Sequence, residues 1–302
     1  MVDIKVFSKN KIVVKKNKPL ASKTWLGVGG CAEFYTEPNT IESLKRTLVC
    51  ADAEKIPVTI LGSGSNLLIR DGGIEGLVIH FGSGLKKIHV EKNKITCGAG
   101  ARLMDIARAA AQHNLSGFEF MEGIPGSLGG GFKTNAGAYG SDLSKITREI
   151  IAMDEHGIKH VIHPQKEDVF GYRTCKLPPA WVFVQAVLVG TEQPTNEAIL
   201  AKMAEYQQKR HMAQPQGVKT AGSTFKNPPD HRAWELLDAA GLRGYTKNGA
   251  QFSTKHPNFL INLGSARAHD LEVLICEAQG RVLAQTGIQL ECEVHILGKE
   301  KK

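Results

Sequence analysis

The sequence lacks the features that place a chain in a membrane or around a structural metal. Within its 302 residues no apolar run approaches the roughly eighteen residues of a membrane-spanning helix, and the first residues contain no apolar signal core. The six cysteines lie at least sixteen residues apart, so no CxxC pair is present for zinc binding or redox exchange. We therefore expect a cytoplasmic protein with reduced cysteines, no bound metal and no membrane partner.

Acidic residues are fewer than basic ones, 30 against 38, which gives a formal net charge of +8. The Lys and Arg residues are scattered and lack the interleaved aromatic residues of a single-stranded nucleic-acid platform, so we expect no nucleic-acid partner. The exception is residues 9–18, which contain five lysines. This run is typical of a solvated N-terminal strand or tail, and the overall basicity would attract small phosphorylated ligands.

Complete nucleotide-binding fingerprints are also absent. No GxxxxGK[ST] sequence is present, and Gly98-Ala-Gly100 has Leu103 at the third glycine position of a dinucleotide fingerprint, although Glu119 lies near the distance of a ribose-binding acid. We therefore interpret Gly98-Ala-Gly100 as an ordinary turn. Three histidines between residues 156 and 163 have the spacing of helical metal ligands. Their segment is better interpreted as two strands around a turn, which leaves the imidazoles on the surface.

Glycine, in contrast, is concentrated in two places. Seven glycines and one proline fall within residues 123–140, and Gly62-Ser-Gly-Ser-Asn66 follows the strand-like residues 58–61. So much backbone without side chains is costly in conformational entropy, and it is usually kept where main-chain N–H groups approach a ligand closely. Turns of this kind suit a phosphate or pyrophosphate. Two such loops predict a dinucleotide.

Hydrophobic periodicity divides the chain into three domains, 1–85, 86–195 and 196–302, with residues 192–196 as a linker. The expected fold class is α+β. The predicted helices are 41–54, 103–113, 197–211, 232–240 and 269–285, and the predicted strands are 58–61, 77–80, 88–90, 95–97, 181–189, 259–262 and 290–297.

Three further segments carry side chains suited to chemistry. Phe170-Gly-Tyr-Arg173 places a guanidinium on a strand-edge loop, where it could bind a carboxylate by two parallel hydrogen bonds or could be a surface cation. The segment 221–228, Ala-Gly-Ser-Thr-Phe-Lys-Asn-Pro, combines glycine, hydroxyls, an ammonium and an amide, although a generic turn would also explain it. Leu290-Glu-Cys-Glu-Val294 alternates like a strand, which would place Glu291 and Glu293 on one face.

Together these segments resemble the UDP-N-acetylenolpyruvoylglucosamine reductase family. These flavoenzymes complete UDP-N-acetylmuramate for peptidoglycan, and so serve cell-wall biogenesis, cell shape and cell division. The resemblance runs from about residue 20 to 298 and rests on seven motifs in order: Thr24-Trp-Leu-Gly-Val-Gly-Gly30, Gly62–Asn66, Gly123-Ile-Pro-Gly126 with Asn135–Gly140, Phe170–Arg173, Gly222–Pro228, Lys255-His-Pro-Asn-Phe259 and Leu290–Val294.

The resemblance implies an FAD-binding domain of the vanillyl-alcohol-oxidase (PCMH) type in two subdomains, 1–85 and 86–195. It also implies a C-terminal α/β substrate-binding domain, 196–302, whose last strand returns to the active site. The short connection from Arg173 to Val189 is similar to the family's compact second type. Three residues depart from the family pattern: Cys175 replaces serine, Cys292 replaces the proline between the two glutamates, and His295 replaces a larger cation.

Site residues also follow from the resemblance. It implies that Arg173, Ser223 and Glu293 are catalytic, and that Tyr172, Lys226 and Asn227 bind the substrate; Cys292 leaves the choice between Glu291 and Glu293 open. Non-covalent FAD would be held by two sets of residues: Gly62, Ser63, Gly64, Ser65, Asn66 and Leu67, and then Gly123, Ile124, Pro125, Gly126, Ser127, Gly130, Asn135, Ala136 and Gly137.

The implied reaction reduces UDP-N-acetylglucosamine enolpyruvate with hydride that passes from NADPH through the flavin to the enolpyruvyl methylene carbon. Arg173 and Glu293 would stabilise the enol-like intermediate, and Ser223 would protonate the α-carbon. Two rival interpretations are a flavin oxidase of the same fold acting on a small alcohol or hydroxy acid, and a nucleotide-binding scaffold without turnover. The 222–228 segment and the two glutamates argue against the oxidase, and the intact Arg173, Ser223 and Glu293 argue against the scaffold.

Overall fold

The computed structural model describes residues 5–301, which form two compact units. The first unit holds residues up to 16, 34–63 and 76–209, and the second holds 17–33, 64–75 and 210 onward. The chain therefore changes unit within four elements: β1 (Lys15–Pro19), β2 (Cys31–Thr36), β5 (Ile74–His80) and α6 (Glu197–Ala213). It also changes unit after Ser63, in the middle of the first glycine-rich loop. The division at residues 85 and 195 stays a prediction.

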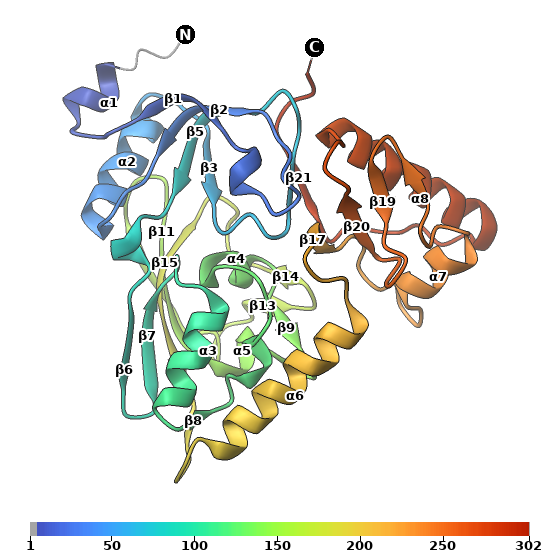
Figure 1. Cartoon of the computed structure of the whole chain (residues 1–302). Helices are drawn as coiled ribbons and strands as arrows, with labels where there is room; N and C mark the ends of the chain where they lie inside the picture. The colour runs from blue at the N-terminus through green and yellow to red at the C-terminus, as the bar shows by residue number, and fades with distance from the viewer. Residues whose placement is uncertain (1–4, 302) are drawn as a thin grey trace. The chain divides into compact units, whose positions relative to one another are not determined.

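The first unit contains most of a four-stranded sheet in the order β1-β2-β5-β3, in which β3 (Val58–Leu61) runs parallel to β5. Helix α2 (Ile41–Ala53) begins at Thr40, whose side chain and that of Ser43 cap each other's main-chain N–H groups. Its Leu44 and Leu48 are buried in the core that also contains Leu77 and Ile79 of β5. Figure 1 shows α2 alongside this sheet. The helix and strand predicted at 41–54 and 58–61 are confirmed.

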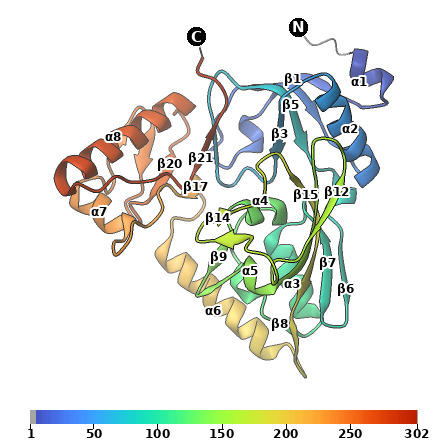
Figure 2. The same cartoon turned by 180° about the vertical axis from the view of Figure 1, so that it is seen from behind.

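A five-stranded antiparallel sheet forms the rest of that core, in the order β12-β11-β15-β7-β6 (Figure 1 and Figure 2). Helix α3 (Leu103–Gln112) buries Leu103, Ile106 and Ala107 and then Ala110 on one side, as expected for an apolar face with a period of 3.6 residues. The strands are β6 (Ile88–Glu91), β7 (Lys94–Gly98), β11 (Thr147–Met153), β12 (Lys159–Ile162) and β15 (Val182–Val189).

Short elements connect these layers and carry much of the site described below. In the first unit they are α1 (Lys5–Lys9), β8 (Leu115–Ser116), α4 (Leu128–Lys133), β9 (Gly137–Ala138), β10 (Ser141–Asp142), α5 (Leu143–Ile146), β13 (Phe170–Gly171), β14 (Thr174–Cys175) and β16 (Thr191–Glu192). In the part of the chain that the structure describes, 3-10 turns lie at Ala21–Lys23, Ser83–Leu85 and Glu119–Met121.

The second unit is built on an antiparallel sheet in the order β17-β20-β19-β18, with its own apolar core. Helices α7 and α8 pack on this sheet through buried leucine, isoleucine and alanine side chains. The elements are β17 (Lys219–Ser223), α7 (Ala233–Ala239), β18 (Thr246–Lys247), β19 (Ala250–Phe252), β20 (Phe259–Asn262) and α8 (Ala268–Thr286).

The strand predicted at 290–297 is wrong over its first half. Only β21 (His295–Leu297) is a strand, and it pairs in parallel with β4 (Leu67–Ile69) in the second unit. Before it, Cys292 makes a single antiparallel bridge with Phe225. The chain bends at Glu293 and Val294, because their main-chain N–H groups turn toward the Thr224 carbonyl oxygen.

Between residues 5 and 301, no helix is long and apolar enough to cross a membrane. The mixture of helices with antiparallel and parallel strands confirms the α+β class.

Candidate active site

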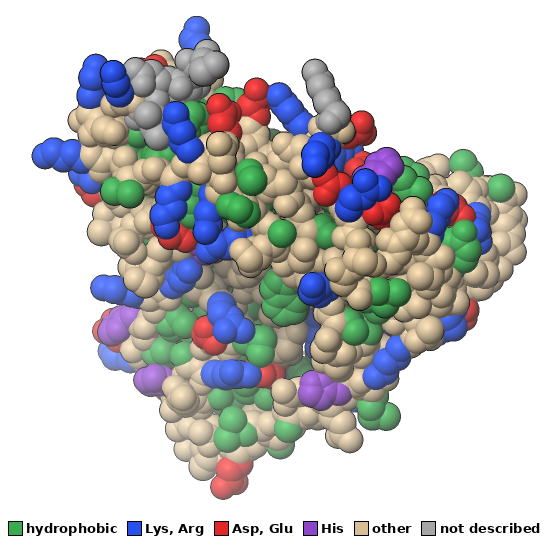
Figure 3. Space-filling model, turned by 45° about the horizontal axis from the view of Figure 1, so that its top comes forward, with side chains coloured by type: hydrophobic (Ala, Val, Ile, Leu, Met, Phe, Trp, Pro, Cys, Tyr) green, Lys and Arg blue, Asp and Glu red, His purple; other side chains and the backbone are tan. Residues whose placement is uncertain are grey.

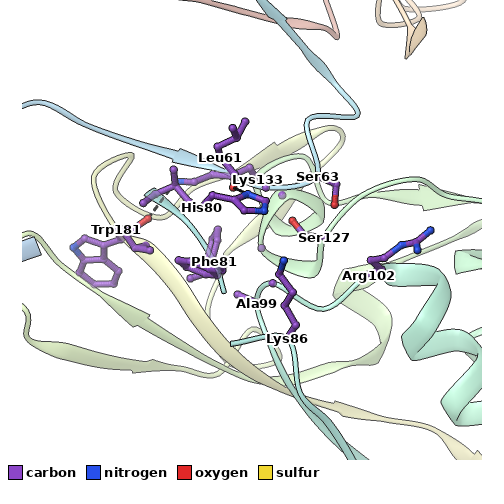
Figure 4. Close-up of a pocket in the computed structure, with 17 residues that line it drawn as sticks. Leu61, Ser63, His80, Phe81, Lys86, Ala99, Arg102, Ser127, Lys133 and Trp181 are labelled. Atoms are coloured by element: carbon purple, nitrogen blue, oxygen red, sulfur yellow. Dashed lines mark hydrogen bonds between the residues drawn. The ribbon is translucent and has the colours of Figure 1, made fainter. Parts of the chain in front are cut away.

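A cavity of about 220 Å³ lies in the first unit, where the end of β3 meets the first turn of α4. Four residues predicted to bind the cofactor line it: Gly62, Ser63, Ser127 and Gly130. In Figure 4, the side chains of Ser63, Ser127 and Lys86 point toward the same space from three segments, whereas the Trp181 ring and the Arg102 guanidinium point outward. The remaining wall is Ile60, Leu61, His80, Phe81, Ala99, Gly100, Gly129, Lys133, Val182 and Phe183.

Glycine at position 62 keeps this cavity open. A Cβ atom on Gly62 would lie 2.5 Å from Ser127 Oγ, across the space between the β3 loop and α4. On its other side, α4 lies against residues 99–101. Gly129 N donates to the Ala99 carbonyl oxygen at 2.8 Å, and Leu128 N donates to the Ala101 carbonyl oxygen at 2.8 Å. Two backbone segments thus meet with little side-chain material between them, as a loop that receives a phosphate requires.

The chemistry of the cavity wall also suits FAD. Phe81, Val182 and Phe183 offer apolar surface for a ring system, and Lys86 and Lys133 offer ammonium groups for phosphates. The Lys133 ammonium lies 5.2 Å from the centre of the Phe183 ring and donates to the Pro179 carbonyl oxygen at 3.1 Å. Partial desolvation lowers the pKa of Lys133.

Residues 99 and 100 form a turn, as expected, but Ala99 and Gly100 also line this cavity. The signal was available in the sequence, because the turn follows a strand and precedes a helix. Because Leu103 occupies the third glycine position, the sequence does not match the complete dinucleotide fingerprint. Position 103 instead carries a buried leucine whose main-chain N–H binds the Gly126 carbonyl oxygen at 3.0 Å.

Several other residues predicted to bind the cofactor lie outside the cavity wall. Residues 64–67 belong to the second unit. Gly123, Ile124, Pro125 and Gly126 form the turn before α4. Asn135 is buried, accepts from Ser144 N at 3.1 Å and donates to the Gly171 carbonyl oxygen at 3.4 Å. Asn135 therefore connects the β9–β10 hairpin, which contains Gly137, to the β13–β14 hairpin, which contains Arg173. Ala136 lies between Asn135 and Gly137 in the chain.

Arg173 occupies the tip of the β13–β14 hairpin, in the first unit. Its φ is +54°, a left-handed conformation that is uncommon for a residue with a side chain. Its Nη1 donates to the Gly137 carbonyl oxygen at 3.5 Å, and the guanidinium lies 5.8 Å from the centre of the Tyr172 ring. The Tyr172 side chain is itself exposed. The strained tip thus carries the guanidinium back toward the glycine-rich β9 hairpin.

Ser223 ends β17 in the second unit, directly after a register shift in the pairing with β20. Gly222 has a φ of +80°, and a Cβ atom there would meet nothing within 4 Å. A bulge at this point turns the next side chain out of the regular alternation. Within residues 5–301, the Ser223 hydroxyl makes no hydrogen bond, so it is available to a ligand.

Glu293 lies next to the same segment. Its main-chain N–H donates to the Thr224 carbonyl oxygen at 2.8 Å, and its carbonyl oxygen accepts from Asn66 Nδ2 at 3.0 Å. Thr224 is fixed in turn by Asn258, whose carbonyl oxygen accepts from Thr224 N at 2.7 Å. The structure therefore brings Ser223, Glu293 and part of the first glycine-rich loop together within the second unit.

The two glutamates differ in their surroundings. The Glu291 carboxylate forms an ion pair with the Lys226 ammonium, and the Glu291 carbonyl oxygen accepts from Lys226 N at 2.9 Å. Asn227 is also engaged, because its Oδ1 accepts from Ala233 N at 3.0 Å at the start of α7. Lys226 Nζ and Asn227 Oδ1 are thus both engaged within the protein, although the ammonium and the amide nitrogen each carry further hydrogens that can donate.

Similarity to known proteins covers both units. Residues 32–156 match the family model described as an FAD binding domain, and residues 214–297 match the one described as the UDP-N-acetylenolpyruvoylglucosamine reductase C-terminal domain. The UDP-N-acetylenolpyruvoylglucosamine reductase of Parvibaculum lavamentivorans is 43% identical over 94% of this chain and 91% of its own. That of Anaplasma marginale is 40% identical over 94% of this chain and 93% of its own.

A crystal structure shows the same likeness in three dimensions. The UDP-N-acetylenolpyruvylglucosamine reductase of Thermus caldophilus is 35% identical, with a TM-score of 0.81, and the match covers 95% of this chain and 99% of that one. This chain belongs to the UDP-N-acetylenolpyruvoylglucosamine reductase family.

Membership in the reductase family makes the chain an FAD-dependent oxidoreductase, and the cavity wall described above fits that cofactor. The resemblance leads us to expect proline at position 292, where this reductase has cysteine. The antiparallel bridge between Cys292 and Phe225 is made by Lys226 N, which donates to the Glu291 carbonyl oxygen at 2.9 Å, and by Glu293 N, which donates to the Thr224 carbonyl oxygen at 2.8 Å. Burial raises the pKa of the Cys292 thiol, which keeps it protonated.

Proposed function

We propose that this protein reduces UDP-N-acetylglucosamine enolpyruvate to UDP-N-acetylmuramate with NADPH, as a step in peptidoglycan precursor synthesis in the cytoplasm. The observation that carries the proposal is 40–43% identity to reductases of this name over 94% of the chain. The NADPH requirement and the roles of individual residues belong to the proposal. Bound FAD would supply a carrier that accepts hydride from the nicotinamide and delivers it to the enolpyruvyl methylene carbon.

Ser223 is assigned the proton that the substrate α-carbon receives. A serine hydroxyl is a weak acid in water, so it needs a fixed position and a dry environment to donate a proton to carbon. The open space beside Gly222 and the unengaged Ser223 hydroxyl are consistent with this role.

Glu293 is assigned the stabilisation of the negative charge that develops on the substrate carboxylate, as a protonated hydrogen-bond donor. Glu291 suits this role less well, because its carboxylate is 72% exposed and forms an ion pair with Lys226. In that position Glu291 orients the Lys226 ammonium, which we assign to the sugar nucleotide together with Asn227 and Tyr172.

Arg173 is assigned to the substrate carboxylate and to the enol-like intermediate. A guanidinium presents two parallel N–H groups in a fixed plane, which matches a carboxylate in a way that an ammonium does not. The hairpin tip limits the movement of this guanidinium, because Tyr172 and the Gly137 carbonyl oxygen both lie beside it.

Steady-state assays test the proposal directly. NADPH oxidation should depend on added UDP-N-acetylglucosamine enolpyruvate, and the Arg173→Lys variant should lose turnover while it still bleaches its flavin with NADPH. Oxidation of NADPH that is independent of the enolpyruvyl substrate would point to a flavin oxidase instead. Equal loss of both half-reactions in Arg173→Lys would assign Arg173 to the fold and not to the chemistry.

A further inference from the structure

A second cavity lies in the first unit and shares no lining residue with the cofactor cavity. Its volume is about 460 Å³, which is within the range of small-molecule sites. Three segments form its wall: the start of β1 with the residues before it, the end of β2 with the residues after it, and the first turns of α2. The lining residues are Lys11, Ile12, Val13, Lys15, Tyr35, Thr36, Glu37, Pro38, Asn39, Thr40, Ser43, Arg46 and Thr47.

Positive charge dominates this wall. Lys11, Lys15 and Arg46 line the cavity together with a single carboxylate, that of Glu37. The carboxylate is already engaged, because Glu37 Oε1 accepts from the Tyr35 hydroxyl at 2.6 Å. Burial and Glu37 raise the pKa of Tyr35, so the phenol stays protonated and keeps donating this bond. The cavity therefore presents an excess of two positive charges.

The three cations have no carboxylate partner within residues 5–301. Arg46 shows this most clearly, because Glu42 precedes it by one helical turn on α2 and the two side chains form no ion pair. At the same spacing on α6, the Lys209 ammonium binds Glu205 at 2.5 Å. Cations that surround a cavity and are not neutralised by the protein attract an anionic ligand.

Two of these cations belong to the lysine-rich stretch at residues 9–18, which the cofactor and substrate sites do not use. Figure 3 shows Lys and Arg side chains over the upper left of the molecule, where α1, α2 and β1 lie in Figure 1. The fold thus brings part of a sequence run expected to be a solvated tail against the first turns of a helix, around a hollow.

We propose that this cavity is a second anion site, which binds a small ligand carrying a diphosphate group. A diphosphate spreads at least two negative charges over several acceptor oxygens, and so matches an excess of two positive charges supplied by separated donors. A monoanion or a single carboxylate would leave one or more of these cations without a partner. The site is independent of the proposed reductase activity, because none of its residues lines the cofactor cavity.

The test is a calorimetric titration of the FAD-loaded enzyme with inorganic pyrophosphate at low ionic strength. The double variant Lys15→Ala/Arg46→Ala should weaken pyrophosphate binding by roughly tenfold or more, since two charge-assisted contacts are removed. A matched double variant, Lys45→Ala/Lys87→Ala, removes the same charge from exposed positions outside the cavity and should change the affinity by less than about twofold. Both variants should keep wild-type flavin content and reductase activity.

Further arms separate this cavity from other sources of binding. Lys226→Ala should leave pyrophosphate binding in place, because the substrate lysine is not part of the cavity. The single reversal Arg46→Glu should weaken binding more than Arg46→Ala. Equal loss in the two double variants would show only diffuse attraction to a basic surface. Loss in Lys226→Ala alone would assign the binding to the substrate site. Either result, or sulfate binding as tightly as pyrophosphate, would overturn the proposal.

Discussion

The side-chain amide of Asn66 donates a hydrogen bond to the main-chain oxygen of Glu293 at 3.0 Å, although the two residues are 227 positions apart in the chain. The contact is reinforced by a second one, from His295 N to the Asn66 carbonyl oxygen at 3.1 Å. Asn66 belongs to the first glycine-rich loop and Glu293 to the segment with the two glutamates. Two motifs that the sequence presents separately therefore form one structure in the second unit.

Removing this contact should impair catalysis more than folding. We expect Asn66→Ala to lower kcat by about tenfold, because Glu293 loses one of the bonds that fix its backbone, while the free energy of unfolding falls by about 1 kcal/mol. Gln251→Ala removes a comparable side-chain bond at the exposed β18–β19 hairpin and should leave kcat unchanged. A loss of kcat of the same size in both variants would contradict the positioning role of Asn66.

The two glycines of the loop should respond differently to substitution. A Cβ atom on Gly64 would lie 1.9 Å from the Lys23 carbonyl oxygen, and its φ is +64°, so Gly64→Ala should destabilise the protein by roughly 1–2 kcal/mol or more. In Gly62→Val the new side chain enters the cofactor cavity, so flavin content should fall while thermal stability of the apoprotein stays near that of the wild type. Full flavin content in purified Gly62→Val would remove Gly62 from the FAD site.

Glu291 and Glu293 form a matched pair for mutagenesis. In Glu291→Gln the ion pair with Lys226 is lost, so we expect KM for the sugar nucleotide to rise with little change in kcat. In Glu293→Gln we expect the step from reduced flavin to substrate to slow by on the order of a hundredfold, with flavin reduction by NADPH near normal. A slowed flavin-to-substrate step in Glu291→Gln, with only a rise in KM in Glu293→Gln, would show that the two glutamates have each other's proposed roles.

Glu277 provides a prediction about pH and stability. Lys247 and Tyr245 bond its carboxylate at 2.9 Å each, and Arg281 bonds it at 2.5 Å, which together lower the pKa of Glu277 to about 2. A carboxylate whose pKa is lower in the folded state stabilises the fold above its unfolded pKa and loses that contribution as pH falls toward the folded value.

The stabilisation from Glu277 should therefore be complete near neutral pH and disappear between about pH 4.5 and pH 2. Glu277→Gln should lower the free energy of unfolding at pH 7 by on the order of 1–3 kcal/mol, since the carboxylate is only 23% exposed. The free energies of unfolding of the wild type and Glu277→Gln, measured by denaturation, should converge as the pH falls toward 2. A difference that is constant with pH would show that charge is not the cause.

Regular elements with a clear period were predictable from the sequence alone. Helices α2, α3 and α8 agree with prediction to within a residue or two, because each buries one apolar face at a spacing of three or four residues. Strand β3 and the glycine-rich loop after it were also predictable. Glycines after a strand identify a turn whose backbone closely approaches a ligand or another segment, but they do not show which of the two it is.

The surroundings of the site were less predictable, because they depend on contacts between distant segments. The alternation in residues 290–294 is typical of a strand, but the bonds from Glu293 and Val294 to Thr224 bend the chain there instead. Similarly, Gly64 was expected to admit a ligand, and the structure shows that packing against Lys23 already requires a glycine. Neither contact leaves a local pattern in the sequence.

Transfer of reducing equivalents to the enolpyruvyl sugar nucleotide is tested most directly by an anaerobic single-turnover experiment in deuterated solvent. The FAD-loaded enzyme is reduced with a single equivalent of NADPH, and UDP-N-acetylglucosamine enolpyruvate is then added in a stopped-flow instrument. We predict that the flavin reoxidises and that UDP-N-acetylmuramate carries solvent deuterium at the lactyl α-carbon, while Ser223→Ala reoxidises on the order of a hundredfold more slowly. A flavin that stays reduced in the presence of this substrate would contradict the proposed reaction, and equally fast reoxidation in Ser223→Ala would contradict the role of Ser223.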